Sequence, residues 1–178
     1  MQMDRAERDR VATLTGYGIM DTPNEPDFDA IVRQTKQALN VPIVLISLLD
    51  EHRQWFKARI GLDVTETPRC ISFCTHALRG PSVLVIPDAR ADERFADNPL
   101  VVGEPHIRFY AGAPLVAENG RRIGTLCVID TAPRAGLPAF QEAQLTALAS
   151  RTMEAMERRK VRRAAILTGR SAANGCAI

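Results

Sequence analysis

The sequence lacks a disulfide framework and any long apolar segment. It has four cysteines among 178 residues, and their spacing is not the paired pattern of a small secreted domain. The longest apolar run, from Val41 to Leu49 with Ser47 inside it, is far too short to cross a bilayer. We therefore expect free thiols and no membrane partner.

A secretory signal and an excess of charge are also missing. The first ten residues, MQMDRAERDR, are highly charged and contain no apolar stretch. We therefore expect a cytoplasmic protein. The net charge of +2 is close to neutral, so no nucleic-acid partner is predicted from overall charge.

Familiar catalytic motifs are absent as well. The chain contains no phosphate-binding glycine loop, no HExxH or GxSxG sequence and no kinase signature. We therefore predict no catalytic residue, no metal ligand and no enzymatic activity of the chain's own. The sequence names no cofactor.

What is present fits one ordinary globular domain. Hydrophobic residues make up 46% and charged residues 25%, and 178 residues are enough for a substantial core. Apolar spacing predicts a short helix over 4–15, ended by Gly16 and Gly18, and an amphipathic helix over 26–39.

Strands are predicted in the centre of the chain. The run 41–49 is typical of a central strand covered on both sides. The next strand, 54–61, is expected to be more exposed on one face, with Trp55, Lys57 and Arg59 alternating with Phe56, Ala58 and Ile60. A loop over 62–69, a short helix over 71–78 and a strand over 82–88 follow.

The C-terminal half of the chain contains the clearest local signals. A short helix or turn and a long loop are expected between 90 and 105, and a hairpin over 107–130 turns at Asn119-Gly120. A helix is predicted from 139 to 168. It would be longer than a small domain is wide, so part of it must project or pack on a partner. The basic run Arg158–Arg163 near its end is interpreted as a solvated helix end.

One stretch, RCISFCTHAL from Arg69 to Leu78, concentrates cysteine and histidine. Zinc is not favoured there, because no further ligands stand at suitable spacing. Cys70 lies near a helix start, where a thiol can be activated, and is the better candidate for a reactive cysteine. An unreactive buried cysteine is the commoner case for a cytosolic thiol.

A polar loop and two aromatic pairs could line a pocket. In the loop after the third strand, Arg94 could clamp an anion and Phe95 could form a lid. Core packing is the alternative for the pairs Trp55-Phe56 and Phe109-Tyr110. The Tyr110 hydroxyl needs a polar partner if it is buried.

Several segments together resemble the GAF domain family. They are GIMDTPNEPDFDAIV, VPIVLISLLDEHRQWFKARIGLDVTETPR, SFCTHAL, DARADERFADNPLVVGEPHIRFYAGAPL and GTLCVID, within 5–134. They look most like the subgroup at the N-terminal end of bacterial sensor histidine kinases and diguanylate cyclases. The resemblance implies an α+β fold, within the broad α/β class. Its central antiparallel sheet of five or six strands would carry terminal helices on one face and a ligand pocket under short helices and loops on the other.

The resemblance also implies pocket residues by position. Ligand-lining positions are expected at Cys74, His76, Asp88, Arg94, Phe95, Asn98, Phe109 and Tyr110. The signature of cyclic-nucleotide-binding members is absent. Bilin-binding members place the attachment cysteine directly before a histidine, whereas Thr75 separates Cys74 from His76 here.

The expected organisation is a sensory domain over 1–136 with its core at about 22–131, a connecting and dimerising helix over 137–168, and a flexible tail over 169–178. We expect a bacterial, cytoplasmic signal-transduction module that binds an unidentified small molecule. It would form a homodimer through its terminal helices and relay ligand state to an output domain, such as the kinase of a two-component system or a cyclase. The alternatives are a thiol-based redox enzyme of the methionine sulfoxide reductase type and a chromophore-binding photosensor using Cys74.

Overall fold

The computed structural model describes residues 4–174, with backbone alone for residues 169–174. The helices are α1 (Arg5–Tyr17), α2 (Pro26–Leu39), the 3₁₀ helix η1 (Arg69–Ile71), α3 (Phe73–Ala77), α4 (Pro99–Val102) and α5 (Ala139–Asn174). The strands are β1 (Ile43–Leu49), β2 (Arg53–Ile60), β3 (Glu66–Pro68), β4 (Leu84–Ile86), β5 (Phe109–Val116) and β6 (Arg122–Asp130). Except for β3, which lies in a predicted loop, these elements confirm the predicted order.

The strands form a single six-stranded sheet in the order β3-β2-β1-β6-β5-β4. Every neighbouring pair is antiparallel. The central strand β1 is buried along its whole length, which explains its continuous apolar sequence. The predicted central antiparallel sheet of an α+β fold is therefore confirmed.

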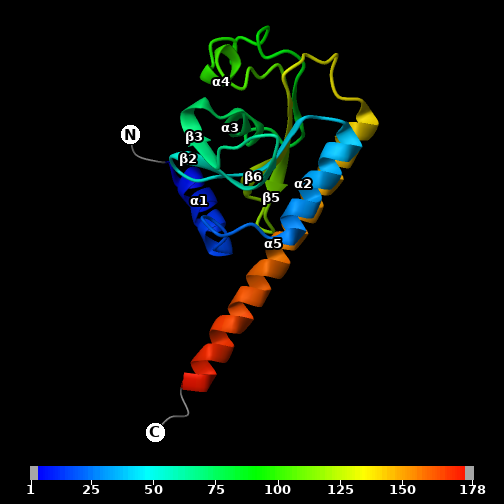
Figure 1. Cartoon of the computed structure of the whole chain (residues 1–178). Coiled ribbons are helices and arrows are strands. Elements are labelled where there is room, and N and C mark those ends of the chain that lie inside the picture. Colours follow the sequence, from blue (N-terminus) through cyan, green and yellow to red (C-terminus); the bar gives the residue numbers. More distant parts are fainter. Residues whose placement is uncertain (1–3, 175–178) are drawn as a thin grey trace.

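The two sides of the sheet are covered differently. Helices α1, α2 and α5 pack on one side, here called the helix face, and α2 runs beside α5 (Figure 1). Short helix α3 packs on the other side, the pocket face, against β5, β6 and β1. Because successive residues of a strand point to opposite faces, each central strand supplies side chains to both layers.

Strand β2 does not alternate as the sequence predicted. Adjacent residues of β1 pair with Phe56 and Ala58, so Lys57 is an extra residue in β2. As a result Ala58 joins Trp55 in the core of the helix face, whereas Phe56 lies on the pocket face. Lys57 is buried instead of exposed. The predicted exposed face was wrong, because a bulge reverses the alternation and the N-terminal end of α2 covers Lys57.

Turn residues end the elements where the sequence predicted. Gly18 follows α1 in the left-handed region at φ 53°, and its N–H donates to the carbonyl of Thr15. Asn40 ends α2 in the same way. Gly120 has φ 78° in the turn between β5 and β6, which confirms the predicted hairpin.

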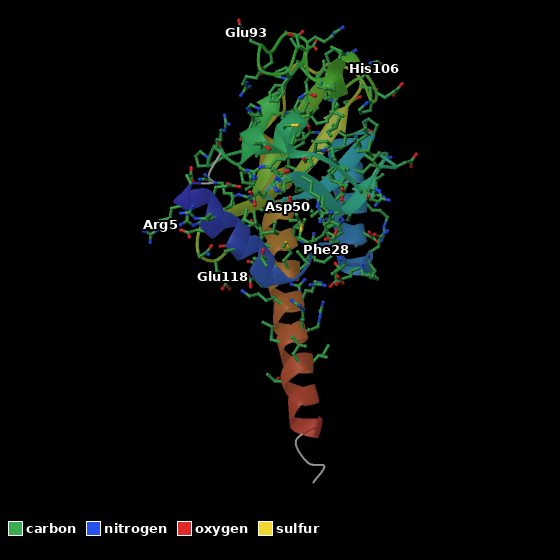
Figure 2. The ribbon with its side chains drawn as sticks, turned by 90° about the vertical axis from the view of Figure 1, so that its left-hand side faces the viewer. Arg5, Phe28, Asp50, Glu93, His106 and Glu118 are labelled. Carbon is green, nitrogen blue, oxygen red and sulfur yellow. The ribbon has the colours of Figure 1, made fainter. Side chains whose placement is uncertain are left out.

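Helix α5 is longer than predicted. It continues through Gly169 to Asn174, whereas the sequence predicted an end at Thr168 and a tail over 169–178. A glycine weakens a helix by about 1 kcal/mol but does not by itself stop one. Residues 175–178 of the predicted tail lie outside the described residues. The C-terminal part of α5 projects away from the sheet in both views (Figures 1 and 2).

The basic run of α5 is more than a solvated helix end. The Arg159 guanidinium is only 15% exposed and bonds to Glu25 Oε1 at 2.7 Å. It also donates to the backbone carbonyls of Tyr17 and Gly18. The interpretation from sequence was therefore incomplete, because this arginine fixes α5 to the ends of two other helices.

Among the residues that the structure describes, no helix is long and apolar enough to cross a membrane.

Candidate functional site

A cavity of about 410 Å³ lies between the pocket face of the sheet and the elements around α3. Its walls are mostly apolar, with side chains from β1, β2, β6 and the segments around α3 and α4. Its lining residues are Ile43, Leu45, Gln54, Phe56, Gly61, Leu62, Asp63, Val64, Thr67, Phe73, Cys74, Leu100, Glu104, Pro105, Ile107, Tyr110, Cys127 and Ile129. A hollow of this size and composition is typical of a small-molecule site.

A hydrogen-bond network fixes one polar wall of the cavity. The Gln54 carbonyl oxygen accepts hydrogen bonds from Ser47 Oγ at 3.1 Å and Ser72 Oγ at 2.6 Å. The Gln54 amide donates to Thr67 Oγ1 at 2.7 Å. Ser72 also caps the N-terminus of α3, because its hydroxyl accepts from the N–H of Thr75. Gln54 therefore presents a fixed amide beside a mostly apolar space.

Two cysteines meet at the inner end of the cavity. Cys74 of α3 and Cys127 of β6 have their sulfur atoms 3.8 Å apart, and the Tyr110 hydroxyl donates to Cys74 Sγ at 3.4 Å. Burial raises the pKa of the Cys74 thiol, but hydrogen bonds from Cys127 and neighbouring hydroxyls outweigh it and lower the pKa to about 6. The bond to Cys74 and burial raise the pKa of Cys127 well above its ordinary value. Of the two thiols, Cys74 is therefore the one that gives up its proton more readily.

Another hydroxyl near these thiols, that of Thr125, has no hydrogen-bond partner in the described part of the chain. Thr125 lies two residues before Cys127 on β6, and among the described residues its hydroxyl is the buried side-chain polar group that makes no hydrogen bond. It faces both sulfurs, and its donation to a sulfur that has lost its proton lowers the pKa of each cysteine. Buried polar groups without partners are rare in folded proteins. This one stands beside a thiol that can become an anion.

Gly112 makes the position of Tyr110 possible. A Cβ atom at residue 112 would lie 2.2 Å from the Tyr110 hydroxyl oxygen. The ring is fully buried and leans along β5 over this glycine. The glycine therefore leaves the space that lets the hydroxyl reach Cys74.

Phe95 and Asn98, two of the predicted site residues, pack behind the roof of the cavity, which is the part of its wall formed by the segments around α3 and α4. The Phe95 ring stacks on Phe73 with ring centroids 4.1 Å apart. The Asn98 carbonyl oxygen accepts from the N–H of Leu100 and caps α4, while its amide donates to the carbonyl of Ile71 at 3.0 Å. These residues therefore position the roof and do not line the cavity.

The other predicted residues are divided among different places. Cys74 and Tyr110 line the cavity. His76 lies on an outer hollow shared with Cys70, with its ring edge against Phe95. Phe109 lies in the core of the helix face. Its predicted pocket position was wrong, because Phe109 and Tyr110 are adjacent on β5 and point to opposite faces.

The charged residues of the long loop interact within the loop. Both oxygens of Asp88 bind the Arg90 guanidinium, and both oxygens of Asp92 bind that of Arg94. Neither Asp88 nor Arg94 lines the cavity. Their predicted pocket positions were wrong, because each side chain folds back on a neighbour two residues away.

Sequence reasoning missed most of the polar lining. Gln54, Thr67 and Cys127 line the cavity, together with Asp63 and Glu104. The period-two pattern of β6 could have placed Cys127 on one face with Ile129. No sequence signal joins Cys127 to Cys74 across 53 positions, because their contact depends on how α3 packs on the sheet.

The charges of the lining have one sign. Asp63 and Glu104 are the charged residues among those that line the cavity, and no lysine, arginine or histidine joins them. Nor do the described residues include a group of three or more histidine, cysteine or acidic side chains placed to hold a metal ion. The site suits a neutral or cationic molecule better than an anion, because nothing in its lining compensates a negative charge.

Comparison with known proteins matches most of the chain to one family. The family model described as GAF domain matches residues 25–156. The chain is 46% identical over 139 residues to a cyclic di-GMP phosphodiesterase of Pseudomonas aeruginosa. That match covers 78% of this chain and 24% of the relative, so the chain spans about a quarter of the relative's length.

Solved structures share the fold at lower identity. The GAF domain of an Acinetobacter phosphoenolpyruvate-protein phosphotransferase is 22% identical, with a TM-score of 0.63 over 88% of this chain and 95% of that one. The free methionine-R-sulfoxide reductase of Neisseria meningitidis, solved with its substrate, is 19% identical, with a TM-score of 0.61 over 92% and 96%. At these identities the likeness shows the fold alone.

The expectation that the chain has no enzymatic role was wrong. It rested on the absence of catalytic motifs, but the 46% identical relative is named a phosphodiesterase, which points to an enzyme-related function. The absent motifs concern these 178 residues, whereas the matched region is only 24% of that enzyme, whose catalytic motifs can lie outside the match.

Proposed function

This chain belongs to the GAF domain family, and on that premise we propose that it senses a small molecule in the cavity of the pocket face and relays its presence through α5. The observation that carries the proposal is the cavity itself. It is mostly apolar and has one fixed amide, that of Gln54. Such a site gives affinity through apolar contact and specificity through a few placed polar groups.

The ligand is proposed to be a neutral or cationic molecule with a substantial apolar part. Asp63 and Glu104 would repel an anion, and no basic side chain lines the cavity. Cys74 and Tyr110 remain in the proposed ligand-contacting set, joined by Gln54 and Thr67. His76, Asp88, Arg94 and Phe109 leave that set, and Phe95 and Asn98 act on it only by holding the roof.

The relay is proposed to run through α5. This helix packs on α2 and β5 and then projects beyond the domain (Figure 2). Three apolar side chains on the projecting part, Val161, Ile166 and Leu167, are each more than half exposed. We propose that two of them, Ile166 and Leu167, which lie about 100° apart around the helix, pack against the same helix of a second copy. Closure of the cavity would then shift a helix pair that an output domain reads.

The output is proposed to act in bacterial cyclic di-GMP signalling in the cytoplasm. The 46% identity to a protein named a cyclic di-GMP phosphodiesterase supports this assignment. In this proposal the segment regulates an enzyme, and the ligand it senses is distinct from the dinucleotide. A cyclic dinucleotide is an anion, and the lining of the cavity offers no positive charge to receive it.

Two dyes test the ligand chemistry. Phenylnaphthylamine is neutral, and anilinonaphthalene sulfonate adds one negative charge to nearly the same rings. We expect the neutral dye to bind at least about tenfold more tightly, because a difference of about 1.4 kcal/mol is a factor of ten. Asp63→Asn combined with Glu104→Gln should narrow that gap, as measured by fluorescence titration. Equal affinity for both dyes in the unmodified protein would contradict the proposal.

A matched pair of variants places the dye in the cavity. Leu100 of α4 lines the cavity, whereas Val102 of the same helix is 64% exposed. Leu100→Trp should abolish binding of the neutral dye, and Val102→Trp should leave it unchanged. If both variants bind alike, the dye is held elsewhere and the cavity is not the site.

Assembly tests the relay separately. Sedimentation of the protein at micromolar concentration should show a dimer, and the double change Ile166→Glu with Leu167→Glu should give monomers. Thr168→Glu adds charge to the same helix without removing an apolar side chain and is the control. A monomer in all three samples would overturn the helix-pair part of the proposal while leaving the binding part intact.

A further inference from the structure

Cys74 and Cys127 form a pair with the features of a reaction site. They come from α3 and β6, 53 positions apart in sequence, and their sulfur atoms are 3.8 Å apart. Both side chains are buried, and both border the cavity. Two thiols in van der Waals contact need only small rotations and a slight approach of α3 to reach the bond length of about 2.05 Å in a disulfide.

The surroundings of Cys74 would stabilise a thiolate without a basic side chain. The Tyr110 hydroxyl already donates to its sulfur at 3.4 Å, and the unpartnered hydroxyl of Thr125 is close by. Hydrogen bonds to the charged form of a thiol favour ionisation even where burial opposes it. Cys127 is the complement, since its pKa is raised and it keeps its proton.

Access to the pair is set by the cavity. Its volume of about 410 Å³ is many times that of a hydroperoxide, and its lining includes both cysteines. Cys70, by contrast, is exposed on η1 and lies on an outer hollow away from this pair. The protein therefore contains an exposed cysteine that serves as an internal reference for the buried pair.

We propose that Cys74 and Cys127 are a peroxide-reactive pair that closes to a disulfide. The Cys74 thiolate attacks one oxygen of hydrogen peroxide, the O–O bond breaks, and Cys74 becomes a sulfenic acid as hydroxide leaves. The sulfur of Cys127 then attacks Cys74, forming the S–S bond as its proton and the sulfenic oxygen leave as water. Two thiols are oxidised, and one peroxide is reduced to two molecules of water after the hydroxide takes up the proton from Cys74.

Closure would tie the roof of the cavity to the sheet. α3 carries Phe73 and Cys74 of the cavity wall, and a bond to β6 would fix it to the central part of the sheet. The proposal is independent of the ligand suggested above, because neither dye titration nor helix pairing requires a reactive thiol. Each can fail while the other holds.

The test uses the full chain with Cys70→Ser and Cys176→Ser, which leaves Cys74 and Cys127 as its cysteines. After treatment with hydrogen peroxide and then an alkylating reagent in denaturant, intact-mass spectrometry should show the loss of two hydrogen atoms and no alkylation. Adding Cys127→Ser should stop the reaction at a Cys74 sulfenic acid that dimedone traps. Adding Cys74→Ser instead should leave Cys127 as a thiol, and circular dichroism confirms that each variant is folded.

In the unmodified protein the buried pair and the exposed Cys70 compete for peroxide, and this competition decides the proposal. The pair should oxidise at lower peroxide concentrations than the exposed Cys70, and Tyr110→Phe and Thr125→Val should each slow the pair several-fold without affecting Cys70. If the pair stays reduced at concentrations that oxidise Cys70, the proposal is wrong. It is equally wrong if Tyr110→Phe and Thr125→Val both leave the rate unchanged, because the hydroxyls would then not activate Cys74.

Discussion

The two faces of the sheet differ in how completely they pair their buried polar groups. On the helix face the Lys57 ammonium is completely buried, and it bonds to Glu25, Thr22 and the carbonyl of Pro23. On the pocket face the hydroxyl of Thr125 is buried with no hydrogen bond, beside two thiols and a cavity. One face compensates a full charge, whereas the other leaves a neutral group without a partner.

This difference separates stability from function. Unpaired buried groups and open cavities both cost free energy of folding, so they persist where something other than folding uses them. Three helices complete the core of the helix face, which therefore carries most of the stability. The pocket face keeps the imperfections that a ligand or a reaction can use.

The largest effect is expected at the buried charge of the helix face. Glu25→Gln should lower the free energy of unfolding by about 3 kcal/mol, because it leaves the Lys57 ammonium buried without a carboxylate. Lys57→Met should cost less than about 1 kcal/mol, because Glu25 keeps its second partner, Arg159. Urea unfolding measures both variants. Equal losses of stability in the two variants would show that Glu25 does not stabilise the buried charge of Lys57.

A smaller loss is expected at Gly112 on the pocket face. Gly112→Ala should destabilise the protein by about 2 kcal/mol, because the added methyl group would lie 2.2 Å from the Tyr110 hydroxyl. Gly16→Ala is the matched control, since nothing lies within 4 Å of that position and alanine favours helix α1. Thermal unfolding should move in opposite directions for the two variants. A shared direction would mean that Tyr110 repositions freely.

Glu7 of α1 should make the free energy of unfolding depend on pH. Burial alone would raise the pKa of Glu7, but hydrogen bonds from Arg10 and Arg69 outweigh it and lower the pKa from 4.5 to about 2. The Glu7 carboxyl binds its proton less tightly in the folded state than in the unfolded state. The stabilisation that its ion pairs give is therefore complete above pH 4.5 and is lost as the pH falls toward 2. Glu7→Gln should cost about 1 to 2 kcal/mol at pH 7. In denaturant titrations from pH 7 to pH 2 the two proteins should converge, and a constant difference would contradict the assignment.

The smallest effect compares one buried threonine on each face. At pH 5, below the lowered pKa of Cys74, Thr125→Val should stabilise the protein by about 1 kcal/mol, because it removes a buried hydroxyl without a partner. Thr152→Val should destabilise it by a similar amount, because the Thr152 hydroxyl donates to the carbonyl of Leu148 at 2.9 Å. Chemical unfolding of the pair measures the contrast. A loss of stability in Thr125→Val would show that its hydroxyl is already bonded, contrary to the structure.

Most of the framework could be predicted from the sequence, because its signals are local. Gly18 and Asn40 end helices, Asn119-Gly120 turns a hairpin, and the run around Leu45 is apolar enough for a central strand. The bulge at Lys57 could not be predicted. It depends on how β1 and β2 pair and on the carboxylate that α2 brings over the sheet.

The site was less predictable than the fold. Adjacent aromatic residues on a strand were both assigned to the pocket, although only Tyr110 faces it and Phe109 packs under the helices. Charged loop residues such as Arg94 were given ligand roles because nothing in the sequence shows that each pairs with a neighbour. Cys74 was assigned to a pocket wall from the sequence, but its contact with Cys127 was not identified.

The sequence by itself determined the family, the order of elements and the position of Cys74 on a short helix, because periodicity, caps and turns act over a few residues. Only the tertiary structure decided that Cys74 meets Cys127 beside Tyr110 and Thr125. It also decided that the cavity has acidic and no basic lining. Contacts between distant segments depend on the packing of whole layers, and a linear pattern of residues does not record that packing.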